Sequence, residues 1–426
     1  MKRTTIAFVT LGCKLNFAET SSIARNFADD GYTRIAASQK ADIYIVNTCS
    51  VTAESDKKCR QTIRKLASQN PEARIIVTGC YANLKPKEIT SLSPNVEIYA
   101  KSAVFPAVSS STTAMSAHRP PMPLDKDFFS AFSSGDRTRS FLKVQDGCDY
   151  HCSYCTVPLA RGHSRNISIA DLQETVRIIA EQNIQEVVLT GVNIGDFGKT
   201  TGESFFELLK ALVKIKGIER YRISSIEPNL LTDDMIDWIA GSAKVLPHFH
   251  IPLQSGNNKI LKEMRRRYTR ELLTGRVEHI KKVMPKAFVG LDVIVGFPGE
   301  TDADFEDTYQ FLESIQPAFL HVFPYSMRPN TPAVSFSGHL SPSEKKIRAK
   351  RLDGLCRQLH RQFYERMIGI TEEVLVESTR KDGRMFGYTR NYIRVELPYD
   401  KSLAGKIVRV HTIGIAPSGN MFCKII

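Results

Sequence analysis

The stretch that decides the fold is Asp146–Pro158, which reads DGCDYHCSYCTVP and spaces Cys148, Cys152 and Cys155 as CxxxCxxC. A closed structural zinc site needs four ligands, which usually come from paired CxxC motifs. The nearby His151 directly precedes a candidate ligand, so a zinc site strains the geometry. Three thiolates on one loop suit a four-iron, four-sulfur cluster that keeps one iron open for an external ligand. The pattern therefore predicts an iron–sulfur site, with zinc or incidental thiols as alternatives.

Around this loop the chain alternates apolar strands with amphipathic helices such as IADLQETVRIIAEQN, from Arg139 onward for some 200 residues. The strand candidates are SFLKVQ, EVVLTG, RYRISSI, HFHIPL, FVGLDVIVG and FLHVFPYS. Six such repeats predict a parallel barrel or a partial (β/α)6 barrel. In barrels of this kind chemistry gathers at the carboxyl ends of the strands, and the cysteine loop follows the first of them.

Upstream of the barrel, three more cysteines each follow a predicted strand. Cys13 ends AFVTLGC, Cys49 ends YIVNTC and Cys80 ends IIVTGC. Near-continuous apolar strands separated by helices indicate a parallel sheet covered on both faces. The carboxyl ends of its strands share one edge, so thiolates far apart in sequence can converge there. The alternative is that these cysteines are buried small hydrophobes, as we expect for Cys59, Cys356 and Cys423.

Composition divides the chain further and limits its partners. The Ser- and Pro-rich segment after residue 100 predicts a linker, and the short alternating runs from about Ile370 predict a small β-barrel. We expect an α/β multidomain protein divided as 1–115, 116–138, 139–366 and 367–426. A charge of +13 implies a polyanionic partner, unless the protein is merely basic with a solvated surface. With no secretory signal or membrane span, we expect a cytoplasmic monomer.

The CxxxCxxC loop, with Tyr154 before its last cysteine and after the first strand of six α/β repeats, resembles the radical S-adenosylmethionine superfamily. The resemblance implies that the open iron binds the amino and carboxylate groups of S-adenosylmethionine. It also implies that an electron from the cluster cleaves the sulfonium and gives a 5′-deoxyadenosyl radical.

The two cysteine triplets together resemble the methylthiotransferase family over nearly the whole chain, with a radical core and a C-terminal TRAM domain that holds RNA. This implies two 4Fe-4S clusters, S-adenosylmethionine as both methyl donor and radical source, and an external electron donor and sulfur source. The segments TLGCKLNFAET and VNTCSVTAESDKKCRQTIRK look like the branch acting on N6-threonylcarbamoyladenosine at position 37 of the tRNA anticodon loop, although Leu15 and Phe17 depart from its usual pattern. Alternatives are N6-isopentenyladenosine-37, a ribosomal protein aspartate, or a zinc-containing RNA-binding protein without catalysis.

Polar residues at further strand ends are candidates for the cosubstrate. The loop LTGVNIGDFG follows the second strand, where radical enzymes place backbone carbonyls against the methionine amino group, so we single out Thr190, Gly191 and Asn193. Ser225 and Glu227 end the third strand, where a carboxylate meets ribose hydroxyls or the ammonium. The fourth strand ends at HIPLQSG, which offers Gln254 beside His250 and Ser255. Each has a structural alternative as a turn, a cap or a core residue.

Two basic segments are candidates for RNA contact. KEMRRRYTRE supplies Arg265, Arg266 and Arg267, and STRKDGRMFGYTRNYIRVELP interleaves arginines with tyrosine and phenylalanine. Cationic side chains neutralise phosphates, and aromatic rings stack on splayed loop bases, which favours a single-stranded loop over a duplex. From the second segment we expect contacts by Arg384, Arg390 and Arg394.

Overall fold

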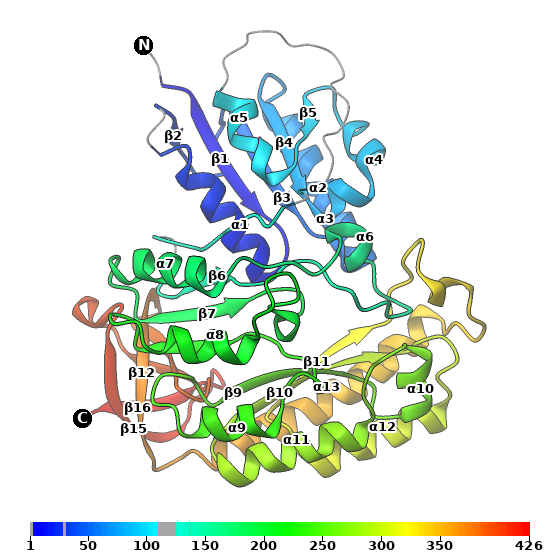
Figure 1. Ribbon diagram of the computed structural model, residues 1–426, viewed down its shortest axis with the longest axis vertical. Helices are drawn as coiled ribbons and strands as arrows, with labels where there is room; N and C mark the ends of the chain where they lie inside the picture. Colours follow the sequence, from blue (N-terminus) through cyan, green and yellow to red (C-terminus); the bar gives the residue numbers. More distant parts are fainter. Residues whose placement is uncertain (1–2, 29–30, 110–124, 126, 136) are drawn as a thin grey trace.

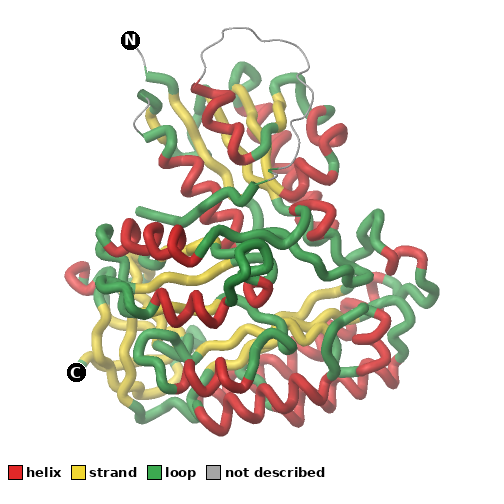
Figure 2. Tube along the Cα trace, viewed as in Figure 1, coloured by secondary structure: helices red, strands yellow, loops and turns green. Residues whose placement is uncertain are grey.

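The computed structural model describes residues 3–28, 31–109, 125, 127–135 and 137–426 (Figure 1 and Figure 2). An N-terminal α/β region lies at the top of the view, a central α/β region lies below it, and a small barrel lies at the left of the central region. Residues 116–124, 126 and 136 of the predicted linker lie outside the described residues. The division of the chain at residues 115, 138 and 366 stays a prediction.

The N-terminal region is a five-stranded sheet in the order β2-β1-β3-β4-β5, with every pair parallel. Its strands are β1 Thr5–Thr10, β2 Thr33–Arg34, β3 Ile43–Thr48, β4 Arg74–Gly79 and β5 Val96–Ile98. Its helices are α1 Lys14–Arg25, α2 Ala53–Gln69, α3 Cys80–Leu84, α4 Pro86–Thr90, α5 Val104–Ser109 and the short η1 Lys101–Ala103. Separate apolar clusters bury both faces, because alternate residues of β3 enter different clusters, which confirms the predicted covered sheet.

The central region holds two three-stranded parallel sheets. The first is β6 Ser140–Lys143, β7 Glu186–Thr190 and β8 Arg220–Ile223, and the second is β9 His248–Gln254, β10 Phe288–Val295 and β11 Phe319–Pro324. A parallel bridge between Tyr221 and Val245 joins them. The six predicted strands are all present, and they form a split, partial barrel.

The helices of the central region are α6 Val157–Arg161, α7 Ile169–Ala180, α8 Phe205–Leu212, α9 Asp233–Ala240, α10 Asn258–Glu263, α11 Arg270–Val283, α12 Asp302–Ile315 and α13 Pro342–Glu365, with the short η2 Ile194–Asp196 and η3 Pro332–Ser335. Of these, α7, α8, α9, α11, α12 and α13 cover one face of the split barrel and share its core. Leu291 of β10 and Leu320 of β11 are buried in one core with Leu273 of α11 and Leu312 of α12. Because side chains alternate along a strand, the residues between them point to the other face.

The C-terminal region is a closed five-stranded barrel in the order β12-β13-β14-β16-β15, as predicted. Its elements are β12 Thr371–Lys381, β13 Arg384–Thr389, β14 Arg394–Pro398, η4 Lys401–Leu403, β15 Ile407–Ile415 and β16 Met421–Ile425. It packs on the central region through a shared core that includes Phe288 and Phe363. In the described part of the chain, no helix combines the length and the hydrophobicity that a membrane crossing requires.

Candidate metal centres

The loop after β6 presents the three closely spaced cysteines with hydrogen-bond donors aimed at their sulfurs. The backbone N–H of Tyr150 donates to Sγ of Cys148, and that of Val157 donates to Sγ of Cys155, each at 3.4 Å. The loop is tight: Gly147 has φ +69°, and a Cβ there would overlap the carbonyl group of His163. Donors around cysteine sulfur are typical of iron–sulfur ligands, whose potential they tune.

Arg266 supplies the third sulfur of this triplet with a donor. Its Nη1 lies 3.0 Å from Sγ of Cys152, its Nη2 pairs with the Glu227 carboxylate, and its Nε donates to the hydroxyl of Tyr268 at 3.1 Å. The side chain of Arg266 is only 4% exposed. Arg266, which was predicted to contact RNA, thus directs its guanidinium to the cysteine site.

Without a bound metal, burial favours the protonated form of the loop thiols. It raises the pKa of Cys155 to about 12 and that of Cys148 to about 11, with smaller contributions from the neighbouring thiols. A coordinated metal deprotonates such thiols outright, so binding a cluster here releases protons.

The predicted cosubstrate loop after β7 carries a buried amide without a partner. Neither side-chain atom of Asn193 has a hydrogen-bond partner in the structure. A Cβ on Gly191 would approach Ile194 and Gln145 to 3.0 Å or less, so the backbone comes close only because this residue is glycine. A buried orphan amide beside a glycine-shaped backbone fits a polar ligand at this position.

Gln145 holds this loop to the cysteine loop, a role that the sequence did not indicate. Its Oε1 accepts from the backbone N–H groups of Val192 and Asn193 at 3.0 and 2.8 Å. Its Nε2 donates to the carbonyls of Asp146 and Gly147 at 3.0 and 2.8 Å. The two candidate loops are thus fastened to each other.

The other candidates for the cosubstrate lie around the same strand ends. Burial raises the pKa of Glu227 even though Arg266 opposes this shift. Gln254 ends β9 with φ +68°, and Ser225 is half-buried. Thr190 was predicted to bind the cosubstrate through its backbone carbonyl. This carbonyl already accepts from the backbone N–H of Val144 at 2.9 Å, as part of the strand pairing.

The structure brings the three dispersed cysteines to one sheet edge. Cys13 follows β1, Cys49 follows β3, and Cys80 follows β4, and these strands are adjacent. Gly12 passes so close that a Cβ there would lie 2.7 Å from Cβ of Cys49. Burial, followed by the neighbouring thiols of Cys80 and Cys13, raises the pKa of Cys49 to about 12.

A buried network of charges connects the two triplets. Arg161 of α6, just beyond the cysteine loop, donates from Nε to Sγ of Cys80 at 3.2 Å. Its Nη1 also donates to Glu19 of α1 at 3.0 Å and to Asp146 at 2.9 Å. Lys143 pairs with the same two carboxylates at 3.0 and 2.6 Å. The network therefore links the chain on either side of the cysteine loop to Cys80 and α1 across a buried interface between the N-terminal and central regions.

Neither triplet is as compact as a single-ion site. The described residues contain one group of three metal-ligating side chains whose ligand atoms all lie within 4.8 Å of one another, and it is His250, Asp292 and His321. Zinc–sulfur bonds of about 2.3 Å would place the thiolates of a zinc site within about 4 Å of each other.

The remaining arginines predicted to contact RNA lie in two regions, beside the cysteine loop and on the C-terminal barrel. Arg265 is exposed, and Arg267 lies over the ring of Tyr150 at 3.9 Å. Arg384 and Arg394 lie over aromatic rings of the C-terminal barrel at 5.3 and 4.8 Å. Arg390 is half-buried and donates to the carbonyl of Ala243 at 2.7 Å, which ties the barrel to the central region.

Family profiles match two segments of the chain. Residues 5–100 match the "Uncharacterized protein family UPF0004", and residues 142–312 match the "Radical SAM superfamily". The first segment contains the dispersed triplet and the second contains the loop triplet.

Known proteins are similar over nearly the full length. The chain is 38% identical to the threonylcarbamoyladenosine tRNA methylthiotransferase MtaB of Bacillus subtilis (strain 168), over 95% of this chain and 93% of that protein. It is 32% identical to the tRNA-2-methylthio-N(6)-dimethylallyladenosine synthase of Syntrophotalea carbinolica, over 94% of this chain and 95% of that protein. The radical S-adenosylmethionine methyltransferase TsrM of Kitasatospora setae shares the fold, with a TM-score of 0.57 at 13% identity over 78% of this chain and 77% of that one.

Proposed function

The chain belongs to the family of threonylcarbamoyladenosine tRNA methylthiotransferases, and on this basis we propose that it converts N6-threonylcarbamoyladenosine at position 37 of tRNA to its 2-methylthio derivative. It is a radical S-adenosylmethionine enzyme that transfers a sulfur-containing group. The observation that carries the proposal is the contact of Arg161 with Cys80, because it links the segment just after the loop triplet to the dispersed triplet.

The cofactors follow from the family and from the donor sets. Membership in the radical S-adenosylmethionine superfamily brings one 4Fe-4S cluster and S-adenosylmethionine, and Cys148, Cys152 and Cys155 are our proposed ligands. When bound, these groups supply a carbon radical that removes hydrogen from an unactivated carbon. We further assign a second 4Fe-4S cluster to the dispersed triplet, where it carries the sulfur to be transferred; an external electron donor and sulfur source complete the reaction.

The residues around the loop triplet bind the cosubstrate and orient the cysteine loop. The unpartnered amide of Asn193 and the close backbone at Gly191 are placed for the polar methionine end of the cosubstrate. Arg266 offsets the negative charge of Cys152 and holds Glu227 in position. Gln145 keeps the cosubstrate loop in register with the cysteine loop. Ser225 and Gln254 are assigned to the same cosubstrate.

The RNA contact is assigned to cationic groups on two regions, of which Arg265, Arg267 and Arg394 are exposed and Arg384 is half-buried. Arg265 and Arg267 lie beside the loop triplet, and Arg384 and Arg394 lie on the C-terminal barrel. We propose that they hold the anticodon loop through its phosphates and splayed bases. The enzyme is expected to work in the cytoplasm as a monomer.

The test is an anaerobic reaction of the reconstituted protein with anticodon stem-loop RNA, S-adenosylmethionine and a reductant, followed by mass spectrometry of the nucleosides. We expect the 2-methylthio form of threonylcarbamoyladenosine. Product only from isopentenyladenosine RNA, or only on a ribosomal protein aspartate, would redirect the substrate assignment. A colourless protein that contains zinc and gives no product would favour a binding protein without catalysis.

A further inference from the structure

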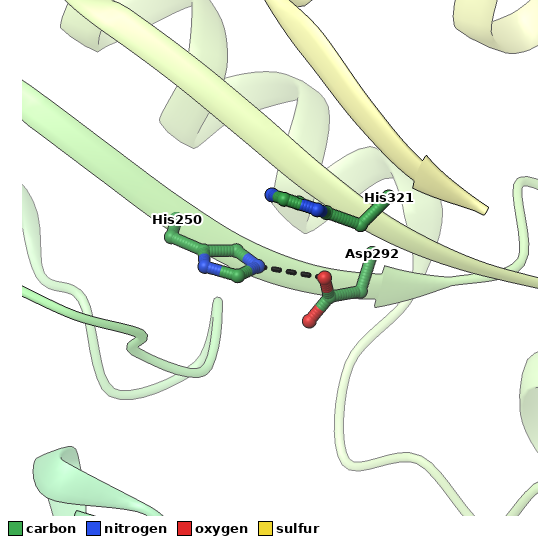
Figure 3. Close-up of side chains that lie close together, drawn as sticks. All are labelled: His250, Asp292 and His321. Carbon is green, nitrogen blue, oxygen red and sulfur yellow. Dashed lines mark hydrogen bonds and ion pairs between the residues drawn. The ribbon is translucent and has the colours of Figure 1, made fainter. Parts of the chain in front are cut away.

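Three polar side chains gather on the face of the second central sheet that is turned away from its helices (Figure 3). His250 comes from β9, Asp292 from β10 and His321 from β11, and Asp292 and His321 are register partners. Their strand neighbours, such as Leu291 and Leu320, point to the helix-covered core. We call these three residues the His–Asp–His cluster; neither the cysteine sites nor the RNA contacts described above use it.

The geometry of the His–Asp–His cluster suits hydrogen bonding better than metal binding. Nε2 of His250 lies 2.6 Å from Oδ1 of Asp292, so the two groups already satisfy each other. The rings of His250 and His321 stack with centroids 4.8 Å apart and planes 26° from parallel. Lone pairs in nearly parallel ring planes do not converge on one ion, while both histidines keep a ring nitrogen for another partner.

Lys14 is a cation whose charge acts on this cluster. It is the first residue of α1 and is half-buried, and its ammonium makes no hydrogen bond or ion pair with any residue that the structure describes. Its charge is felt at the cluster: burial, His250 and Lys14 lower the pKa of His321. An ammonium taken partly out of water without an anion is costly, which indicates that an anion arrives from outside the chain.

Other cations near Lys14 are already neutralised. Arg222 pairs with Glu186 at 2.7 Å, and Arg139 pairs with Glu377 at 3.3 Å and with Glu186 at 3.8 Å. These arginines, Tyr392 of the C-terminal barrel and the thiol of Cys13 are the titratable groups that act on Lys14. Lys14 is therefore the cation of this group that is left for a ligand.

Electrostatic interactions link the cluster to groups beside both cysteine triplets. On one side, Lys14 directly follows Cys13 of the dispersed triplet. On the other side, Asp292 is close enough to Glu227 to raise its pKa, although burial raises it most, and Glu227 pairs with the arginine that contacts Cys152. A substrate atom that must meet both sites would bring its substituents to this face of the sheet.

We propose that the His–Asp–His cluster and Lys14 together hold the N6 substituent of the target adenosine, with the carboxylate of the substituent at Lys14 and its urea and hydroxyl groups at the cluster. This inference rests on the proposed function and specifies its substrate. A threonylcarbamoyl group offers one anion and several hydrogen-bond donors, which match one free ammonium and the acceptors of Asp292 and the histidines. An apolar isopentenyl group would leave these groups desolvated and unpaired, so the pocket selects against it.

The experiment measures dissociation constants of the reconstituted full-length protein for anticodon stem-loop RNAs by fluorescence anisotropy. The RNAs carry adenosine, threonylcarbamoyladenosine, its neutral methyl ester or isopentenyladenosine at position 37. We expect the wild type to bind the carboxylate form about tenfold more tightly than the ester, the size of one charge-assisted contact. K14M should bring this ratio to about one, because the contact is gone. Lys216→Met, in the exposed loop before β8, is the matched control and should keep the wild-type ratio.

A second variant is needed because K14M could alter iron binding at the neighbouring Cys13. H321A lies on another strand, and it should reduce the preference for threonylcarbamoyladenosine over plain adenosine by about five- to tenfold through lost hydrogen bonding. Unchanged preferences in both variants would overturn the inference. So would calorimetry showing that the wild type binds one Zn²⁺ or Mn²⁺ that H321A does not bind, since the cluster would then be a metal site.

Failure of the inference and failure of the proposed function give different results. If the wild type methylthiolates the threonylcarbamoyladenosine RNA while K14M and H321A keep the wild-type binding ratios, only the pocket assignment is wrong. If the wild type modifies isopentenyladenosine RNA alone, the substrate of the enzyme is wrong, and the pocket assignment fails with it.

Discussion

The two cysteine triplets are assembled in different ways. The loop triplet, Cys148 to Cys155, is built by one turn of chain after β6, whose backbone N–H groups donate to the sulfurs. The dispersed triplet, Cys13, Cys49 and Cys80, forms only because β1, β3 and β4 are adjacent and parallel. The first site needs a correct loop, and the second needs a correct sheet. A damaged sheet should therefore cost the second site and spare the first.

The largest effect that distinguishes the two sites is expected from Cys152→Ala. Removing a ligand of the loop triplet should lower 5′-deoxyadenosine formation to below about one-hundredth of the wild-type rate, since even outer-shell losses cost a metal site about 10- to 100-fold. Chromatography of a single-turnover reaction measures it. Cys356→Ala, a buried cysteine that contacts the backbone of Leu320, is the control and should stay active. A normal rate in C152A would remove the loop triplet from radical formation.

Cys49→Ala tests the role of the dispersed triplet. Without this ligand the dispersed triplet cannot hold a cluster, so the methylthio product should be lost while 5′-deoxyadenosine still forms. Mass spectrometry of the RNA and of the small molecules gives both values from one reaction. Cys59→Ala, a buried neighbour whose thiol donates to the carbonyl of Cys49, tests whether packing alone matters. Product at the wild-type level in C49A would end the sulfur-carrying role of this triplet.

Paired glycine variants test sheet against loop directly. Gly79 has φ +94°, and an added Cβ would overlap Asn47 and the carbonyl of Thr48, so Gly79→Ala should displace Cys80. Gly147→Ala should displace the loop triplet in the same way. Such strain costs about 1–3 kcal/mol, and each variant should lose about one cluster of iron, only Gly147→Ala losing 5′-deoxyadenosine as well. Gly383→Ala, with φ +71° and open space around it, controls for backbone strain alone. Equal losses at both sites would mean that the triplets do not form independently.

The buried charge network of Glu19, Arg161 and Lys143 links the dispersed triplet to the segments on either side of the cysteine loop. Its contribution to stability should become measurable as the pH is lowered. Burial raises the pKa of Glu19, but Arg161, Lys101 and Lys143 together hold it well below the ordinary carboxyl value. A carboxyl whose folded pKa is lowered stabilises the protein above about pH 4, and this contribution disappears as the pH falls further. In metal-free protein, Glu19→Gln should lose about 3–5 kcal/mol at pH 7 and flatten the acid side of the stability profile. Denaturant unfolding at several pH values measures both, with the exposed Glu174→Gln as control. An unchanged profile would show that the network contributes nothing to the interface.

The smallest effect is expected far from both sites. Arg394→Gln on the C-terminal barrel should weaken tRNA binding by about two- to fivefold and lower the salt dependence by about one phosphate contact. Iron content and 5′-deoxyadenosine formation should stay as in the wild type. Arg177→Gln on α7, where the arginine pairs with Glu174, is the matched exposed control. Equal affinity and salt slope in both variants would argue against an RNA contact at Arg394.

Most of the fold was predictable because apolar periodicity is local. The parallel N-terminal sheet, the six central strands and the C-terminal barrel all follow from runs of apolar residues between turns, and the structure confirms each. The split of the central strands into two sheets, joined by the bridge of Tyr221 and Val245, was not predictable. Strand spacing in sequence does not report how far neighbouring strands separate.

The side chains around the sites were harder to predict than the cysteines. Three consecutive arginines read as one basic patch, yet the middle one, Arg266, turns inward to Cys152 while its neighbours do not. Arg161 and Gln145 gave no signal, because their partners lie on other elements. From the sequence, His250 was either a core histidine or a site residue, and only the structure shows that it pairs with Asp292.

By itself the sequence determined the loop triplet, the order of the elements and the positive charge, because spacing, periodicity and composition are properties of neighbouring residues. The tertiary structure alone decided that Cys80 meets Arg161, that Arg266 is buried, and that the charge of Lys14 acts on His321. These contacts join residues on separate strands and helices. Burial and charge pairing exist only once the chain has brought such residues together, and they set which cations are used and which remain free for a ligand.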